Sequence, residues 1–186
     1  MGLVGRCKRV TVFAPPEPGV RPAVSISGFG PDRRHGALEY SPMAHPDLDQ
    51  LLNSALEFAK QMLSKHGEFF PFGSSMDPAG KIIMDGAHTG DEHPPSQELI
   101  DLLAQSYAQR AEAGELRAAA ICADVRVVPP GKSGKTDAIS VGLEHQSGEA
   151  VTVFLPYQKG WFGKISYGGL FASARDAQFF RKSGTA

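Results

Sequence analysis

The sequence predicts an α+β fold, in which a central antiparallel sheet of about five strands carries two main helices. Apolar residues recur at three- and four-residue spacing in two segments, which is the periodicity of helices that bury one face. Other segments alternate apolar and polar residues and are joined by short turns rich in glycine and proline. Because short turns connect antiparallel strands and parallel strands need long crossovers, we expect an antiparallel sheet and not a doubly wound parallel one.

The two helices are the clearest elements. The first begins at Asp47, which can cap its start, and ends before Gly67, a residue type suited to a C-cap. The second begins at Ser96 and ends near Gly114. The first helix has a broad apolar face, so we expect it to be buried against the sheet.

Six segments have the pattern of strands, which gives the element order α-β-β-α-β-β-β-β. The turn Asp77-Pro78-Ala79-Gly80 joins the first two into a hairpin, because proline presets φ and glycine accepts positive φ. Pro71 has no N–H to donate, which favours an edge or a bulge for the first strand. The predicted strands cover residues 68–75, 81–87, 116–128, 137–146, 149–157 and 164–173.

Composition divides the chain into one domain and two tails. Residues 1–46 contain seven prolines and six glycines, which is the composition of a tail or a loosely attached extension. The segments Arg9 to Ala14 and Ala23 to Phe29 leave an alternative open, in which short strands are added to the edge of the sheet. We expect residues 47–180 to form a single α+β domain with one core, and residues 181–186 to form a C-terminal tail.

Charge and cysteine content narrow the classes of partner. With 19 basic and 20 acidic residues the net charge is −1, which provides no field to hold nucleic acid or an anionic membrane. No run of about 18 apolar residues and no secretory signal is present. Cys7 and Cys122 lie far apart, in segments of different character, and predict neither a disulfide framework nor a metal knuckle. We therefore expect a cytoplasmic protein without nucleic-acid or membrane partners.

The stretch VVPPGKSGKTDAIS (127–140) resembles the end of the phosphate-binding pattern G-x-x-x-x-G-K-[ST]. When Gly134-Lys135-Thr136 is aligned with the end of the pattern, Pro129 stands where the first glycine is required. Proline offers neither the N–H nor the φ that a loop around phosphate needs. Residues 137–143 then alternate as in a strand, whereas a phosphate loop leads into a helix. We expect a solvated hairpin tip and no nucleotide or other cofactor.

The loop HTGDEH gathers potential ligands for a divalent ion ahead of the second helix. The candidate metal ligands are His88, Asp91 and His93, with Glu92 beside them. Their spacing matches no defined metal motif, and carboxylates before a helix are favoured by the positive end of its dipole. We therefore interpret this segment as an acidic loop at a helix N-terminus and predict no metal there.

Cys122, Glu144 and His145 raise the question of a thiol nucleophile with a base on a neighbouring strand. If the two strands pair across the loop, we expect Asp124 and Arg126 to share a face with Glu144. His145 then points to the other face. A cross-strand ion-pair set is favoured over a catalytic dyad, and Cys122 is predicted to be an inert, mostly buried thiol.

The segment PYQKGWFGKISY supplies the best candidate for a contact surface. Tryptophan and tyrosine are the usual anchors of protein interfaces, and lysines lie between the aromatic residues here. The alternative is a hairpin whose aromatic rings pack across strands or cover the open end of the core. The predicted interaction residues are Tyr157, Trp161, Phe162 and Tyr167.

The element order over about residues 47–173 resembles that of profilin-like and roadblock-like folds, in which a five-stranded antiparallel sheet carries helices on its faces. No sequence motif of those families is present. Separately, the strings GEFFPFG, LEH, VFLPY and YGGLFAS are similar to those of a class of small uncharacterised bacterial proteins. Neither resemblance implies an activity.

On these grounds we expect a small cytosolic, non-enzymatic protein that binds another protein or itself. No nucleophile–base pair, phosphate loop or metal motif in the sequence points to catalysis. Active-site groups commonly come from separated positions, however, which leaves an alternative open. It is a small hydrolase or metal-dependent enzyme whose site assembles from residues such as His88, Asp91, His93 and Glu144.

Overall fold

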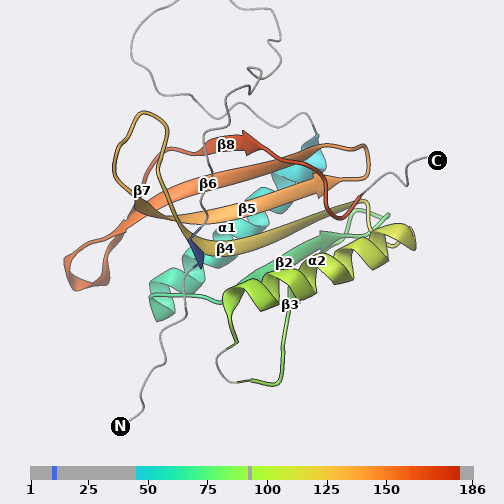
Figure 1. Ribbon diagram of the computed structural model, residues 1–186, viewed down its shortest axis with the longest axis horizontal. Coiled ribbons are helices and arrows are strands. Elements are labelled where there is room, and N and C mark those ends of the chain that lie inside the picture. The colour runs from blue at the N-terminus through green and yellow to red at the C-terminus, as the bar shows by residue number, and fades with distance from the viewer. Residues whose placement is uncertain (1–9, 12–44, 92–93, 181–186) are drawn as a thin grey trace, which may run out of the picture.

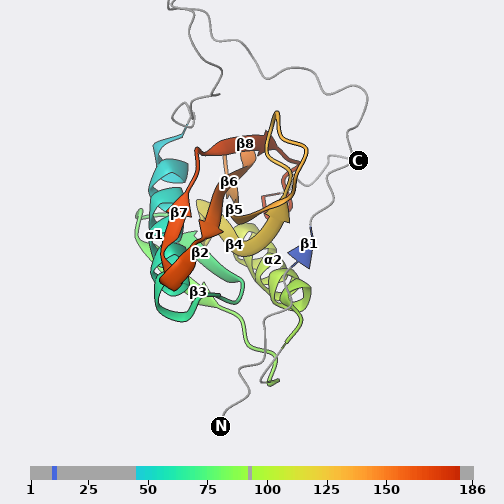
Figure 2. The same cartoon turned by 90° about the vertical axis from the view of Figure 1, so that its left-hand side faces the viewer.

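The computed structural model of the protein describes residues 10–11, 45–91 and 94–180. Seven strands form one antiparallel sheet (Figure 1), and Figure 2 shows its two helices on opposite sides of it. The predicted α+β class and the order of helices and strands are confirmed. The elements are β1 (Val10–Thr11), α1 (Pro46–His66), β2 (Phe72–Met76), β3 (Ile82–Gly86), α2 (Ser96–Glu112), β4 (Ala118–Val127), β5 (Thr136–His145), β6 (Ala150–Lys159), the 3₁₀ turn η1 (Trp161–Gly163), β7 (Ile165–Tyr167) and β8 (Phe171–Ala174).

The strands lie in the order β3-β2-β4-β5-β6-β7, and β8 also pairs with β6. The sheet is larger than predicted because residues 164–173 form two strands rather than one. Gly168 and Gly169 separate β7, which pairs with the end of β6, from β8, which pairs with its beginning. β2 starts four residues later than predicted, at Phe72, because Pro71 cannot donate to the ladder.

α1 covers one face of the sheet with an almost continuous leucine and alanine stripe. Its N-cap is His45 and not Asp47: the His45 side chain accepts a hydrogen bond from the Asp47 N–H, and Pro46 occupies the first turn. Gly67 ends the helix at φ 76°, as expected of a C-cap glycine. The buried residues of the stripe are Leu48, Leu51, Leu52, Ala55, Leu56, Ala59 and Leu63.

α2 packs on the opposite face, against β2 and β4. Tyr107 is its central anchor: the side chain is fully buried and its hydroxyl donates to Asp85 Oδ2 at 2.8 Å. Burial, followed by the charge of Asp85, raises the pKa of Tyr107. The backbone of β2 passes so close that a Cβ added at Gly73 would stand 1.9 Å from Tyr107 Oη.

The chain after β8 is held on the α2 face by one buried carboxylate. Glu144 is 0% exposed and accepts hydrogen bonds from the guanidinium of Arg175 and from the backbone N–H groups of residues 178–180. Phe179 is thereby buried against Tyr107, with ring centroids 5.5 Å apart. We call residues 175–180 the C-terminal clasp.

Most of the predicted N-terminal extension (1–46) and the predicted C-terminal tail (181–186) lie outside the described residues. Within the extension, β1 pairs in parallel with β4, Val10 opposite Val125 and Thr11 opposite Arg126. This strand falls in the segment for which a short edge strand was the alternative interpretation. The second such segment, Ala23 to Phe29, lies outside the described residues.

Neither helix of the described chain combines the length and the apolar character that crossing a bilayer demands.

Replacing Gly73 by alanine should destabilise the fold, because the new methyl group overlaps the hydroxyl and Cζ of a Tyr107 ring that has no room to move. Overpacking of this kind costs about 1–3 kcal/mol. Urea unfolding would measure the loss. Gly86→Ala on the paired strand is the matched control, because its new Cβ meets nothing within 4 Å. Equal stability of the two variants would contradict the packing described.

Replacing Glu144 by glutamine should cost about 3–5 kcal/mol, because Arg175 and three N–H groups lose the buried anion that binds them. Limited proteolysis should then cut within residues 175–180. Glu115→Gln is the control: this carboxylate also pairs with an arginine, Arg110, but its side chain is 62% exposed, so its loss should cost less than about 1 kcal/mol. A clasp that stays protected in Glu144→Gln would exclude this role for the carboxylate.

Candidate functional site

The β6–β7 hairpin extends beyond the neighbouring strands (Figure 1). Its tip carries an exposed aromatic residue. Trp161 opens the turn η1, and its side chain is 90% exposed. The turn is closed by a 2.8 Å hydrogen bond from Gly160 N–H to the Lys164 carbonyl, and Gly163 takes a φ of 76°. Lys159, the last residue of β6 before the turn, ties the hairpin to the end of α1 by donating to the carbonyl of Gly67.

The other predicted interaction residues have different surroundings. Tyr157 is 1% exposed and donates its hydroxyl proton to Asp124 Oδ1 at 2.8 Å, so it belongs to the core and faces no solvent. Tyr167 is 37% exposed, and the Lys60 ammonium lies 5.3 Å from the centroid of its ring. The backbone of Phe162 lies in η1, while its side chain is outside what the structure describes. Among the predicted interaction residues whose side chains the structure describes, Trp161 and Tyr167 are therefore the exposed ones.

An open groove of about 930 Å³ lies between the β4–β5 loop and the chain that connects β7 to β8. The glycine- and lysine-rich loop that resembled a phosphate-binding loop forms one wall. Strand β5 begins at Thr136, directly after this loop, so no helix N-terminus faces the groove. The predicted hairpin is confirmed by the antiparallel pairing of β4 and β5. The groove is lined by residues 129–136, Pro156, Gln158 and residues 168–171.

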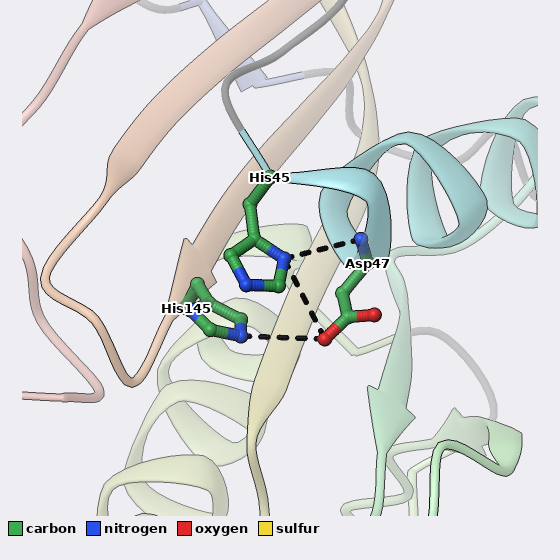
Figure 3. A group of neighbouring side chains, drawn as sticks. All are labelled: His45, Asp47 and His145. Carbon is green, nitrogen blue, oxygen red and sulfur yellow. Dashed lines mark hydrogen bonds and ion pairs between the residues drawn. The ribbon is translucent and has the colours of Figure 1, made fainter.

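A cluster of polar side chains lies at the end of the sheet opposite to the groove, where the N-terminus of α1 meets the end of β5. Figure 3 shows the side chains of His45, Asp47 and His145 converging there. Asp47 Oδ2 lies 3.4 Å from His145 Nε2 and 3.6 Å from His45 Nδ1. The two imidazoles are stacked, with ring centroids 3.6 Å apart. We call these three residues the His–Asp–His cluster.

The cluster is buried on one side and open on the other. The side chains of His145 and Asp47 are 5% and 8% exposed, while that of His45 is 31% exposed. Arg117 donates to the other carboxylate oxygen, Asp47 Oδ1, at 2.7 Å. His145 Nδ1 accepts the Ser147 N–H at 3.1 Å and lies 2.8 Å from Ser147 Oγ. Arg117 thus fixes the orientation of the Asp47 carboxylate, and Ser147 fixes that of the His145 ring.

The surroundings of His145 lower its pKa. Burial lowers the pKa of His145, and the stacked imidazole of His45 lowers it further, while Asp47 and Glu149 act in the opposite sense. Its Nε2 is buried and, despite the nearby Asp47, makes no well-formed hydrogen bond with any described residue. A buried polar atom without a hydrogen-bond partner is unusual and calls for an explanation.

The predicted cross-strand set of Asp124, Arg126 and Glu144 is wrong. Even-numbered residues of β4 stand opposite odd-numbered residues of β5, so Glu144 faces α2 while Asp124 lies on the α1 face. Arg126 pairs instead with Asp137, at 3.3 Å.

The prediction that His145 points away from the face of Cys122 is wrong. Both side chains lie on the α1 face of the sheet. His145 stands opposite Ala118, at the start of β4 and four residues from Cys122. The thiol is completely buried, and this burial, followed by the charge of Asp124, raises the pKa of Cys122 well above its usual value. Cys122 therefore has the surroundings of an inert thiol, as predicted.

The loop before α2, which holds the candidate metal ligands, supplies no ligand cluster among the residues that the structure describes. His88 and Asp91 are exposed, and Glu92 and His93 lie outside the described residues. Glu144 was a candidate in the enzymatic alternative. Both oxygens of its carboxylate accept hydrogen bonds from the C-terminal clasp. The His–Asp–His cluster was not predicted, because His145 lies about a hundred residues after His45 and Asp47 and only the fold brings it to them.

No protein-family model, curated protein or solved structure matches this chain. The likeness in element order to profilin-like and roadblock-like folds is therefore not confirmed. A function has to be assigned from the geometry of the hairpin tip and of the cluster alone.

Proposed function

We propose that this protein is a non-enzymatic module that binds a protein partner in the cytoplasm through the tip of its β6–β7 hairpin. The observation that carries the proposal is the 90% exposure of Trp161. A tryptophan buries about 150–250 Å² in a contact, which at about 25 cal/mol per Å² is worth on the order of 4–6 kcal/mol before ordering costs. Because Trp161 stays exposed in the folded protein, this free energy of burial is available only when a partner covers the side chain.

The residues around Trp161 suit the centre of a protein contact. Interfaces are enriched in tryptophan and tyrosine at their core, with polar and charged residues at the rim. Here Tyr167 adds a second exposed ring, and Lys159 and Lys164 flank the tip with positive charge. The complementary surface is an apolar pocket that receives the indole and is bordered by aspartate or glutamate side chains.

The backbone of the tip is already ordered before binding. The Gly160 to Lys164 hydrogen bond closes the turn, and the bond from Lys159 to the Gly67 carbonyl anchors the hairpin on α1. Pre-organisation of this kind lowers the entropy lost on association. It favours recognition by a rigid aromatic anchor over folding of the hairpin on its partner.

Replacing Trp161 by alanine should weaken partner binding about 30-fold or more, the effect of losing an interface anchor worth about 2 kcal/mol. Because Trp161 is the only tryptophan of the chain, its fluorescence reports directly on the tip. A blue shift on adding the partner, or on raising the protein concentration if the partner is a second copy, should accompany binding. Cross-linking in cells followed by titration of the captured protein would measure the affinity.

Leu102→Ala is the matched control, because Leu102 is an exposed apolar residue of α2 on the other side of the sheet. The control should retain the partner that Trp161→Ala loses, and both variants should unfold at the wild-type denaturant concentration. Light scattering would separate self-association from binding of a different protein. The proposal fails if the wild type is monomeric and retains no protein that Trp161→Ala loses, or if the tip binds only anionic vesicles.

A further inference from the structure

The His–Asp–His cluster has the spacing of metal ligands. Ligands that lie about 2.0–2.2 Å from Zn²⁺ at the corners of a tetrahedron are about 3.4 Å apart. Asp47 Oδ2 lies 3.4 Å from His145 Nε2 and 3.6 Å from His45 Nδ1, and all three atoms lie within 4.8 Å of one another. One ion placed among the three atoms would meet each of them at close to a coordination distance.

Arg117 and Ser147, which contact the cluster from the interior, make the kind of hydrogen bonds that orient metal ligands. A histidine that binds a metal through one ring nitrogen usually donates its other N–H to an acceptor. Ser147 Oγ, 2.8 Å from His145 Nδ1, can accept that proton in the tautomer that leaves the lone pair of Nε2 free for an ion. In this tautomer Nδ1 no longer accepts the Ser147 N–H. Arg117 occupies Asp47 Oδ1, so the carboxylate offers the single oxygen Oδ2 to an ion.

The buried Nε2 atom of His145 is consistent with a cation at this position. Nε2 belongs to a side chain that is only 5% exposed, lies in the cluster and makes no well-formed hydrogen bond with the described residues. A cation between Nε2 and Oδ2 would satisfy both atoms at once.

We propose that His45 Nδ1, Asp47 Oδ2 and His145 Nε2 bind one divalent transition-metal ion, with Zn²⁺ as the best-suited. Two imidazoles with one carboxylate oxygen suit Zn²⁺, Co²⁺ or Ni²⁺, whereas Mg²⁺ and Ca²⁺ take oxygen ligands almost throughout. Three protein ligands leave a fourth position, on the side where His45 is exposed, for water or an anion.

Besides the Ser147 N–H bond to His145 Nδ1, binding changes two contacts that the cluster makes without a metal. His45 Nδ1 releases the Asp47 N–H that it accepts at 3.2 Å. The His45 ring also leaves its stack on His145, because the lone pairs of two nearly parallel rings do not point at one ion. His45 is the partly exposed member of the cluster and has the freedom to make this movement.

The test is a calorimetric titration of the tag-free, EDTA-treated full chain with Zn²⁺. We expect one ion per chain, and at least about tenfold weaker binding in His45→Ala and in Asp47→Asn. Co²⁺ should give the visible absorption of a four- or five-coordinate site, which both variants lose. In proton–nitrogen spectra, Zn²⁺ should shift the ring signals of His45 and His145.

His66→Ala is the control, because His66 is an exposed histidine at the other end of the same helix, and its loss should leave the affinity unchanged. His45→Ala is the informative variant, since His45 is partly exposed and its removal spares the buried ring of His145. The proposal is overturned if the wild type binds no Zn²⁺ or Co²⁺. It is equally overturned if His45→Ala and Asp47→Asn, folded by circular dichroism, bind as tightly as the wild type.

Discussion

The register between β4 and β5 is the constraint on which the rest of this structure depends. Ten residues of each strand pair, from Ala118 opposite His145 to Val127 opposite Thr136. Because side chains alternate between the faces, this register sends His145 towards α1 and Glu144, its neighbour in sequence, towards α2. One of these residues joins the His–Asp–His cluster and the other binds the C-terminal clasp. A slip of one residue would exchange the two and bury a carboxylate where a histidine belongs.

The same pairing separates the two candidate sites in space. β6 begins beside the end of β5, opposite Glu144, and ends beyond Asp137, where the β6–β7 hairpin leaves the sheet. The His–Asp–His cluster therefore lies at one end of the sheet, and the exposed tip of Trp161 lies past the other. The alanine run 118–120 lies beside the cluster, with Ala118 opposite His145. It is completely buried, and its small side chains let both helices approach the central strand. Neither site shares a residue with the other, so each can be altered without disturbing its counterpart.

Local signals in the sequence were sufficient for the elements but not for the contacts between them. The apolar period of α1, the glycine at position 67 and the turn before Gly80 act within a few residues, and each was predicted correctly. The prolines before GKSGKT likewise indicated a hairpin. The parity of the β4–β5 register is set by how the whole sheet packs, so the faces of Glu144 and His145 were assigned wrongly. The burial of Tyr157 and the approach of His45 to His145 depend on that packing as well, and no periodic pattern encodes them.

The C-terminal clasp has a consequence for the order in which this protein acquires its structure during synthesis. Glu144 is made well before residues 178–180, yet its carboxylate is satisfied only when those residues arrive. β1 likewise waits for Val125, more than a hundred positions later in the chain. Until residues 178–180 have been synthesised and have left the exit tunnel, the α2 face is incomplete and the Glu144 carboxylate lacks these three N–H donors. The α2 face is therefore among the last parts of the described fold to form during synthesis, because it depends on contacts between residues far apart in the chain.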